Sequence, residues 1–385
     1  MLERPPLSLY IHIPWCVRKC PYCDFNSHES ESPLPEAQYI DALLEDFSQE
    51  FGRLDTDQIE LQSIFIGGGT PSLFGGASYK KLLQRINESL AFATDIEVTL
   101  EANPGTAEAG RFTDFREAGI NRLSLGIQSF DDARLQQLGR IHNADEALKA
   151  IELAKNAGFA NFNLDLMHGL PDQTAKDALN DLQIAMECNP SHVSWYQLTI
   201  EPNTVFYRRP PELPHENILE EIQISGQKLL ESQDYHQYEV SAYAKPGNKS
   251  LHNQNYWSFG DYMGIGAGAH GKITLPDESK ILRTRKIKQP NHYLTALNGR
   301  NGELKEILTQ ERPLEFLMNA LRLRRGFSKK QFESRTGLPF GEIAKRVESQ
   351  VENGLMQMEE VDDELLISTT ATGYRFLNSV LEEFL

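Results

Sequence analysis

Three cysteines lie close together near the start of the sequence, Cys16, Cys20 and Cys23 in the run CVRKCPYC. This spacing can hold three irons of a four-iron cluster and leave the fourth iron open, because full ligation takes four cysteines. Phe25 occupies a position where a nearby fourth cysteine could stand, and Cys188 is far downstream. The spacing therefore indicates an iron–sulfur cluster open to a small molecule, and argues against a closed zinc site.

Two other uses of these cysteines fit the sequence less well. Disulfides would suit an exported protein, but the start of the chain, MLERPPLSLYIHIPW, has an acidic residue, adjacent prolines and no cleavage site after an apolar core. Buried inert cysteines are the second alternative, yet Arg18 and Lys19 lie between them, where positive charge favours thiolates. We therefore expect reduced cysteines in a cytoplasmic protein.

The composition indicates a globular protein without membrane segments. The chain has 385 residues, of which 40% are hydrophobic and 24% charged, enough for a large core and an additional domain. No apolar run approaches the roughly 18 residues that would span a bilayer. The formal net charge is −17, and an acidic chain repels polyanions unless basic residues are segregated on one surface. We therefore expect no nucleic-acid partner.

The elements that would position the cysteines follow a repeated strand–helix pattern. Short apolar runs predict strands at 7–13, 62–67, 96–103, 121–128, 162–169 and 192–199. Segments of helical period lie between them, for example at 37–52, 78–90, 144–157 and 174–187. Such alternation predicts an α/β fold with a parallel sheet, a partial or complete (β/α) barrel whose active site lies at the carboxyl ends of the strands. The cysteine run follows the first strand at that end.

Three regions are predicted along the chain. Residues 1–205 form the barrel core, residues 206–309 a capping extension, and residues 310–385 a smaller C-terminal domain. In the last region, helices at 313–325, 328–336 and 340–353 precede short strands at 355–359 and 364–367 and a final helix, an order that resembles a winged helix. This region has more acidic than basic residues, so a protein-packing or lid role is favoured over DNA binding.

A glycine-rich turn follows the second predicted strand, in Gly67-Gly68-Gly69-Thr70. Backbone without side chains can approach a ligand closely and offer amide and carbonyl groups to it. The alternative is a tight strand-to-helix turn without a ligand, since the run is neither a P-loop nor a G-x-G-x-x-G motif. Its position one strand–helix unit after the cysteines favours the ligand-binding role.

Polar side chains stand near the ends of three further predicted strands, namely Glu101, Gln128 and Asp165. Such groups suit ribose hydroxyls or an amino group, and strand ends in a barrel meet at one mouth, so we expect a shared ligand. A solvated loop position is the alternative for each residue alone. Arg140 in LGRIHN could bind a carboxylate through two hydrogen bonds, or cap a helix end.

Several motifs together resemble a known family. The cysteine run, with Tyr22 before its third cysteine, is followed in order by GGGTPS, EANPGT, GIQSF, LGRIHN and NLDLMHGLPD. This series resembles radical S-adenosylmethionine enzymes of the oxygen-independent coproporphyrinogen III oxidase group, over nearly the whole chain. Within that group, the segment HNQNYW at 252–257 and the short N-terminus resemble the haem chaperone branch.

The resemblance implies a cofactor set and its ligands. Cys16, Cys20 and Cys23 would hold a [4Fe-4S] cluster whose fourth iron binds the amino and carboxylate groups of S-adenosylmethionine. The remaining pocket residues that the resemblance implies are Tyr10, Tyr22, Gly68, Gly69, Thr70, Glu101, Gln128, Arg140 and Asp165. In such proteins an electron from the cluster cleaves the sulfonium to methionine and a 5′-deoxyadenosyl radical, while the protein orients the cofactor.

Two differences separate this sequence from the coproporphyrinogen-oxidising branch. That branch has a further cysteine where this chain has Phe25, and a longer segment before the strand that carries Tyr10. The haem chaperone resemblance implies that His252 ligates haem iron while Tyr256 and Trp257 stack on the macrocycle. A packed polar turn is the alternative for this segment.

The leading hypothesis is a haem chaperone that binds haem and transfers it to an acceptor protein, with the cluster and S-adenosylmethionine controlling release or assembly. A membrane-associated acceptor is compatible with it. The alternative is an oxygen-independent coproporphyrinogen III dehydrogenase, which decarboxylates propionates to vinyl groups. It requires the same cluster beside a substrate cradle.

Overall fold

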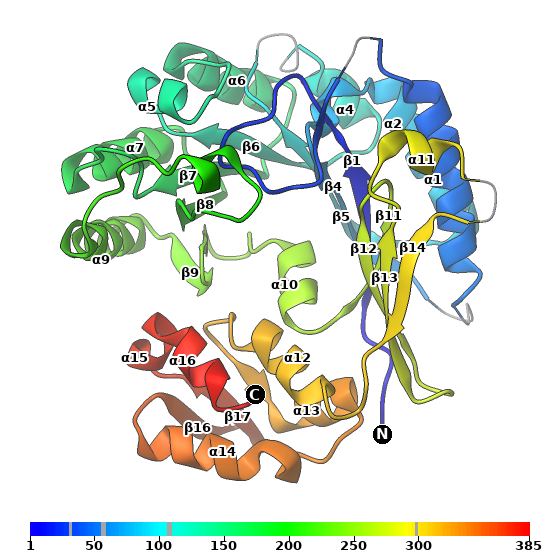
Figure 1. Ribbon diagram of the computed structural model, residues 1–385, viewed down its shortest axis with the longest axis vertical. Helices are drawn as coiled ribbons and strands as arrows, with labels where there is room; N and C mark the ends of the chain where they lie inside the picture. Colours follow the sequence, from blue (N-terminus) through cyan, green and yellow to red (C-terminus); the bar gives the residue numbers. More distant parts are fainter. Residues whose placement is uncertain (31–32, 55–58, 106–109, 297–298) are drawn as a thin grey trace.

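A curved sheet of twelve strands runs through most of the molecule (Figure 1). The structure is a computed structural model, and it describes residues 1–385 except 31–32, 55–58, 106–109 and 297–298. Thr106, which ends the EANPGT motif, lies outside the described residues. The central strands are all parallel: β1 (Leu7–Ile13), β4 (Leu61–Gly68), β5 (Phe92–Ala102), β6 (Arg122–Gln128), β7 (Phe162–His168) and β8 (His192–Gln197).

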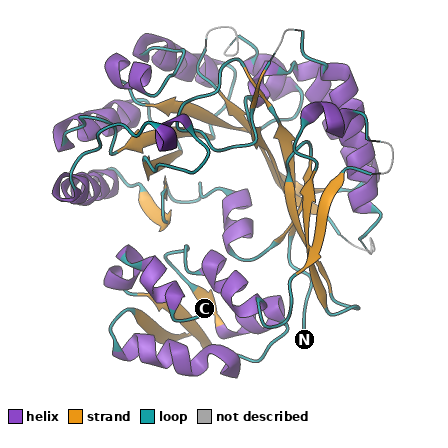
Figure 2. Cartoon of the chain, viewed as in Figure 1, coloured by secondary structure: helices purple, strands orange, loops and turns teal. Residues whose placement is uncertain are grey.

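Helices connect these strands and cover the outer face of the sheet (Figure 2). They are α1 (Glu36–Phe51), α2 (Gly76–Ser89), α4 (Phe112–Glu117), α5 (Asp132–Gln137), α6 (Ala144–Asn156), α7 (Ala175–Glu187) and α9 (Glu216–Ser232). The 3-10 turn η1 (Pro71–Leu73) and α8 (Val205–Arg208) lie at the carboxyl ends of the strands, where Phe206 N of α8 donates to the carbonyl of Pro21. The predicted α/β fold with a parallel sheet is confirmed. In the described part of the chain, no helix is both long and apolar enough to cross a membrane.

The sheet does not close on itself in the described chain, so the barrel is partial. Beyond β1, the order continues with β11 (Asp261–Ile265), β12 (His270–Leu275), β13 (Lys280–Lys286) and β14 (Asn301–Glu306). Beyond β8 it continues with β10 (Ala242–Ala244) and β9 (His236–Glu239). The segment 206–309, which also holds α10 (Leu251–Trp257) and α11 (Pro290–Leu294), therefore supplies both edges of the main sheet.

Each central strand is apolar on one side and largely polar on the other. In β1, Leu9 and Ile11 are buried in the main core, which lies between the sheet and its helices. Ser8 and Tyr10 alternate with them and point to the inner, concave side, where Ser8 Oγ lies 2.8 Å from Ser63 Oγ of β4. Because successive side chains of a strand face opposite ways, the concave interior is lined by polar groups. We call this interior the lumen.

The C-terminal residues form a unit with its own apolar cluster, which includes Phe316, Phe327 and Phe332. Its elements are α12 (Arg312–Ala320), β15 (Phe327–Ser328), α13 (Lys329–Thr336), α14 (Gly341–Glu352), β16 (Met356–Val361), β17 (Glu364–Thr369), α15 (Ala371–Arg375) and α16 (Leu377–Glu382). The order confirms the winged-helix-like prediction. Phe259 and Ile281 of the preceding region belong to the same cluster, so the unit packs directly on the sheet region.

One predicted helix boundary is wrong. The helix expected at 313–325 ends at Ala320, because the following residues turn back toward the β9 edge. Leu323 forms an isolated antiparallel bridge with Glu239, and the amide of Arg324 donates to the carbonyl of Tyr238 at 3.0 Å. Tertiary pairing therefore overrides the local helical pattern here.

The packing of α9 on the sheet generates a stability prediction. A methyl group at Gly226 would meet the Trp195 ring at 2.0 Å, so Gly226→Ala must displace a buried indole, at a cost of about 1–3 kcal/mol. We expect a lower thermal unfolding midpoint. Gly341→Ala is the matched control, since a methyl there meets nothing within 4 Å. Equal midpoints for the two variants would contradict this packing.

Candidate functional site

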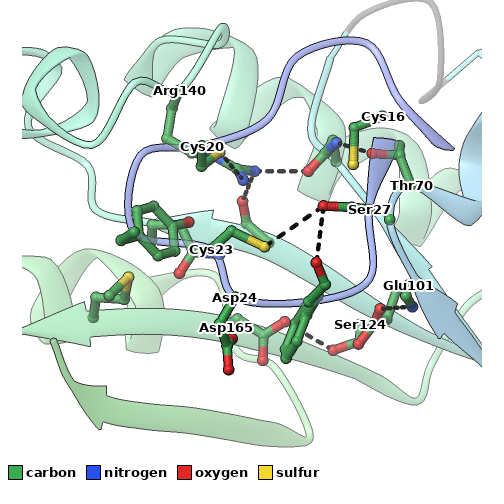
Figure 3. Close-up of a pocket in the computed structure, with 18 of the residues that line it drawn as sticks. Cys16, Cys20, Cys23, Asp24, Ser27, Thr70, Glu101, Ser124, Arg140 and Asp165 are labelled. Atoms are coloured by element: carbon green, nitrogen blue, oxygen red, sulfur yellow. Dashed lines mark hydrogen bonds between the residues drawn. The ribbon is translucent and has the colours of Figure 1, made fainter. Parts of the chain in front are cut away.

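A cavity of about 350 Å³ lies between the cysteine run and the carboxyl ends of the central strands (Figure 3). It contains most of the residues predicted from the sequence. Its lining includes Cys16, Cys20, Tyr22, Cys23, Gly68, Gly69, Thr70, Glu101, Gln128, Arg140 and Asp165. Residues from β4, β5, β6 and β7 and from one N-terminal turn thus face one space.

The cysteine turn is attached to the sheet through its backbone. The short strands β2 (Trp15–Cys16) and β3 (His28–Glu29) pair with each other and close the turn at its base. The amides of Gly69 and Thr70 donate to the carbonyls of Ile13 and Trp15, both at 2.7 Å. Lys19 Nζ donates across the turn to the carbonyl of Phe25 at 3.1 Å. The turn is therefore ordered by main-chain hydrogen bonds and by the Lys19 side chain, and it does not need its thiols for this.

The three thiols lie at separate points of the cavity wall, as Figure 3 shows. All cysteines of the described chain are free and partly buried. Burial raises the pKa of the Cys16 and Cys23 thiols, and Arg140 Nη1 donates to Cys20 Sγ at 3.7 Å. Among the described residues, no three His, Cys, Asp or Glu side chains are grouped as a site for a single metal ion. A cluster assignment rests on the shared cavity and on the spacing in the chain.

The glycine turn uses its amides within the protein. Gly68 N donates to Glu101 Oε2 at 3.0 Å, while Gly69 and Thr70 donate to the cysteine turn. Gly68 has φ +115°, and a methyl at Gly69 would lie 2.5 Å from the Trp15 carbonyl oxygen, so both positions require glycine. With its amides engaged, the turn can accept hydrogen bonds from an amino group through carbonyl oxygens, but it does not resemble an anion site.

Two carboxyl groups lie close to each other below this turn. Burial, and then the charge of Asp165, raise the pKa of Glu101 to about 8. Burial also raises the pKa of Asp165, although Asn163 and Ser124 donate to its oxygens at 2.7 and 3.0 Å and partly offset this. A positively charged or hydrogen-bond-donating ligand would relieve the repulsion between the two carboxyls. The pair therefore fits an amino group, a sulfonium or ribose hydroxyls.

Arg140 connects the cysteine turn to the strand ends. Its Nη2 donates to Asn103 Oδ1 and to the carbonyl of Gly126, both at 2.7 Å, in addition to the contact with Cys20. Its buried Nε has no hydrogen-bond partner among the described residues. An unpartnered buried donor at a cavity wall fits a ligand with an acceptor group, such as a carboxylate.

Four of the sequence-predicted residues lie outside this cavity. Tyr10 is in the lumen beneath it, where its hydroxyl is 2.8 Å from His12 Nδ1 and its ring stacks on Phe65 at 5.9 Å. His252, Tyr256 and Trp257 belong to α10, which packs on β1, β4 and β11. The segment HNQNYW is therefore a helix and not a turn.

The helix α10 occupies the opposite end of the lumen from the cysteines. Its N-terminus meets Glu97 of β5, whose Oε1 accepts from Leu251 N at 3.1 Å and lies 3.1 Å from His252 Nδ1. The His252 ring also stacks on Phe65 at 4.1 Å. Glu97 precedes Glu101 by four residues on the same face of β5, which places the two ends of the lumen about 13 Å apart along the strand.

Glu97 and Asn103 are functional candidates that the sequence reasoning missed. Asn103 donates to Thr70 Oγ1 at 3.0 Å and holds Arg140 on its other side. For Glu97 a signal was available, because IEVTLEAN alternates and places Glu97 on the same strand face as Glu101. The partner of Glu97 on α10 is 155 residues away, and no local pattern indicates it.

Comparison with known proteins gives consistent matches. The Radical SAM superfamily model matches residues 10–185, and the HemN C-terminal domain model matches residues 308–361. A Haemophilus influenzae protein named Heme chaperone HemW is 51% identical over 391 residues, with 100% of this chain and 99% of that one covered. The Escherichia coli protein of the same name is 49% identical over 386 residues, with 100% of both chains covered.

A solved structure supports the fold. The coproporphyrinogen III oxidase HemN from Escherichia coli, described as a radical SAM enzyme, has a TM-score of 0.81 to this chain. The match covers 99% of this chain and 90% of that one, at 22% sequence identity. At this identity the likeness establishes a common fold only.

The raised pKa of Glu101 predicts a pH-dependent stability of the ligand-free protein. Between the ordinary pKa of a glutamate and about 8, folded Glu101 keeps a proton that the unfolded chain releases, so stability falls as pH rises through this window. In Glu101→Gln this contribution disappears. Urea unfolding at pH 5 and pH 8 should show a smaller loss of free energy in Glu101→Gln than in wild type, by a few kcal/mol at about 1.4 kcal/mol per pKa unit.

Glu88→Gln serves as the control for this measurement, because Glu88 is an exposed residue of α2 that forms a surface ion pair with Arg85. It should show the wild-type pH dependence. Parallel stability curves for wild type and Glu101→Gln would exclude a raised pKa at Glu101.

Proposed function

Because this chain belongs to the HemW family of heme chaperones, we propose that it binds haem and transfers it to an acceptor protein. One observation on the residues supports this proposal most directly. The segment HNQNYW lies in one helix, α10, which therefore carries a histidine, a tyrosine and a tryptophan close together. Tyr256 is 39% exposed there, so an aromatic surface is open to a flat ligand.

The cofactors of the proposal are a [4Fe-4S] cluster and S-adenosylmethionine. Cys16, Cys20 and Cys23 would hold the cluster, and Glu101, Asp165 and the glycine turn would bind S-adenosylmethionine, together with Tyr22, Gln128 and Arg140. When bound, the cluster supplies one-electron chemistry at its open iron. The unpartnered Arg140 Nε and the crowded carboxyl pair support this fit, since both gain from a ligand with carboxylate and cationic groups. Thiols that must stay reduced support a cytoplasmic location.

His252 is the proposed ligand of the haem iron. Burial lowers its pKa, so the ring is neutral near pH 7 and one nitrogen carries a lone pair. Burial alone would raise the pKa of Glu97, but the hydrogen bond from His252 and the charge of Arg122 lower it to about 2. An ionised Glu97 only accepts hydrogen bonds, so it favours the tautomer with Nδ1–H. The lone pair of Nε2, which lies 3.4 Å from Ser250 Oγ, would then bind the iron. Glu97 is thus a proposed positioning residue.

The separation of the two ends of the lumen favours the chaperone over the coproporphyrinogen dehydrogenase. A substrate of radical chemistry must contact the cofactor, whereas the proposed tetrapyrrole helix meets β5 at Glu97, about 13 Å along the strand from Glu101. Phe25 is 59% exposed on the cysteine turn, in the position where the oxidising branch has a further cysteine. Both observations support a protein that binds its tetrapyrrole outside the cavity and does not oxidise it there. The acceptor we propose is a protein, either free or membrane-associated.

Replacing one cluster ligand tests the cofactor proposal. Cys20→Ala should abolish the broad visible absorption and iron content of anaerobically reconstituted protein, while far-UV circular dichroism stays unchanged because backbone contacts order the turn. Cys188→Ala is the matched control and should keep the cluster, since Cys188 lies outside the cavity. A full cluster in Cys20→Ala would refute the ligand assignment.

Haem titration tests the cargo proposal. Wild type should give a saturable Soret band, and His252→Ala a shifted or weakened one, because the axial ligand is lost. Glu97→Gln should keep the haem but raise its reduction potential, since a neutral partner reduces the basicity of the imidazole. His236→Ala, at an exposed histidine, is the control. Absence of saturable binding in wild type rejects the function, whereas wild-type spectra in His252→Ala reject only the ligand.

A further inference from the structure

An arginine-rich turn, Arg322-Leu323-Arg324-Arg325, follows α12 and lies against the end of α10. Figure 1 shows α10 between the sheet and the C-terminal unit, on the side of α12, and the two helices are in contact. Two of these arginines reach α10 and the third points elsewhere. The chain has a formal net charge of −17, so three arginines in one turn beside the proposed haem helix form a local positive charge that suits an anionic ligand.

Arg322 lies on the indole of Trp257. Its guanidinium carbon is 4.2 Å from the ring centroid, a cation–π contact. Its Nη2 is 3.5 Å from Glu239 Oε2, so this ion pair is long, and its buried Nε has no hydrogen-bond partner among the described residues. The buried Nε1 of Trp257 is also without a partner within the described chain. These polar groups are therefore poorly satisfied by the protein itself.

Arg325 is exposed and close to the same helix end. Its Nη2 donates to the Oγ of Ser258, the C-cap of α10, at 3.5 Å, which is the long limit of a hydrogen bond. Within the described residues, Arg325 takes part in no ion pair, so its charge is available. Arg324, by contrast, is stacked on Tyr374 at 4.5 Å, within the C-terminal unit.

The surface beside these arginines is aromatic. Tyr256 packs against Trp257 at 4.8 Å and against Tyr262 at 4.9 Å between ring centroids, and its own side chain is partly exposed. An exposed tyrosine ring backed by two more buried aromatic rings, with guanidinium groups nearby, suits a flat aromatic molecule that carries carboxylates. Haem is such a molecule, with two propionates at one edge of the porphyrin.

The spacing along α10 agrees with the dimensions of haem. Ser258, beside Arg325, follows His252 by six residues, which is about 9 Å along a helix axis. This is comparable to the distance from the centre of a porphyrin to its propionate carboxylates. Along the helix axis, one haem therefore spans the distance from the histidine to the arginine turn.

We propose that Arg322 and Arg325 bind the propionate carboxylates of the haem carried on α10. This assignment rests on the proposed function. It names the residues that would distinguish a tetrapyrrole with free carboxylates from one without them. The site then comprises two parts of the chain, because α10 provides the histidine and the aromatic rings while the C-terminal unit provides the cationic groups. Loss of either part weakens haem binding.

Haem and haem dimethyl ester, in which both propionates are neutral, are the probes for this site. Wild type should bind haem at least about tenfold more tightly than the diester, as expected for charge-assisted hydrogen bonds. Arg325→Ala should lose about tenfold in affinity for haem and little for the diester. Arg322→Gln should behave in the same way, and the double variant should bind both probes equally.

Arg324→Ala is the matched control, because it removes one positive charge from the same turn without touching α10. It should bind both probes like wild type, and thermal unfolding shows whether Arg322→Gln is folded. Wild-type haem affinity in Arg325→Ala and in Arg322→Gln would overturn the propionate assignment and leave the haem function intact. Equal losses for haem and diester would also overturn it. Failure of wild type to bind haem would reject the proposed function itself.

Discussion

The structure depends on one constraint: the polar side chains that line the lumen of the open barrel are buried and need hydrogen-bond partners. The strands face their helices with apolar side chains, so their other side carries polar groups that are buried and need partners. A buried hydrogen-bonded chain runs through this lumen from the cavity to α10. Its members, in order, are Asp165, Ser124, Asn163, His192, Tyr238 and Asn253. The barrel interior is thus one continuous polar network, and the cavity and α10 are its two ends.

Glu97 shows how this constraint shapes the α10 end. Its carboxylate is buried, lies near Arg122 and accepts hydrogen bonds from the first amides of α10 and from His252. The same contact therefore holds the helix in the mouth of the lumen and orients the imidazole. At the cavity end, burial outweighs the hydrogen bonds to Asp165 and the charge of Arg122, and the pKa of both Glu101 and Asp165 is raised. The carboxylate of Glu97 is therefore satisfied within the protein, whereas the carboxyls of Glu101 and Asp165 gain from a ligand.

The C-terminal unit gains a role from its position beside α10. Its composition gives no reason to expect an anionic ligand, yet the turn after α12 carries Arg322 and Arg325 to the end of that helix. The turn is placed there by a bridge between Leu323 and Glu239, which also ends α12 early. The departure from the expected helix and the basic surface beside α10 therefore have the same structural origin.

The sequence by itself determined the cysteine spacing, the strand–helix alternation and the residues at the strand ends, because these are local patterns of period and distance along the chain. Cys16 and Asp165 line one cavity, since parallel strands end at one edge. Only the tertiary structure decided that the barrel stays open, that β11 pairs with β1, and that His252 meets Glu97. The last two join segments more than 150 residues apart. Such pairings depend on how whole elements pack, which no local period specifies.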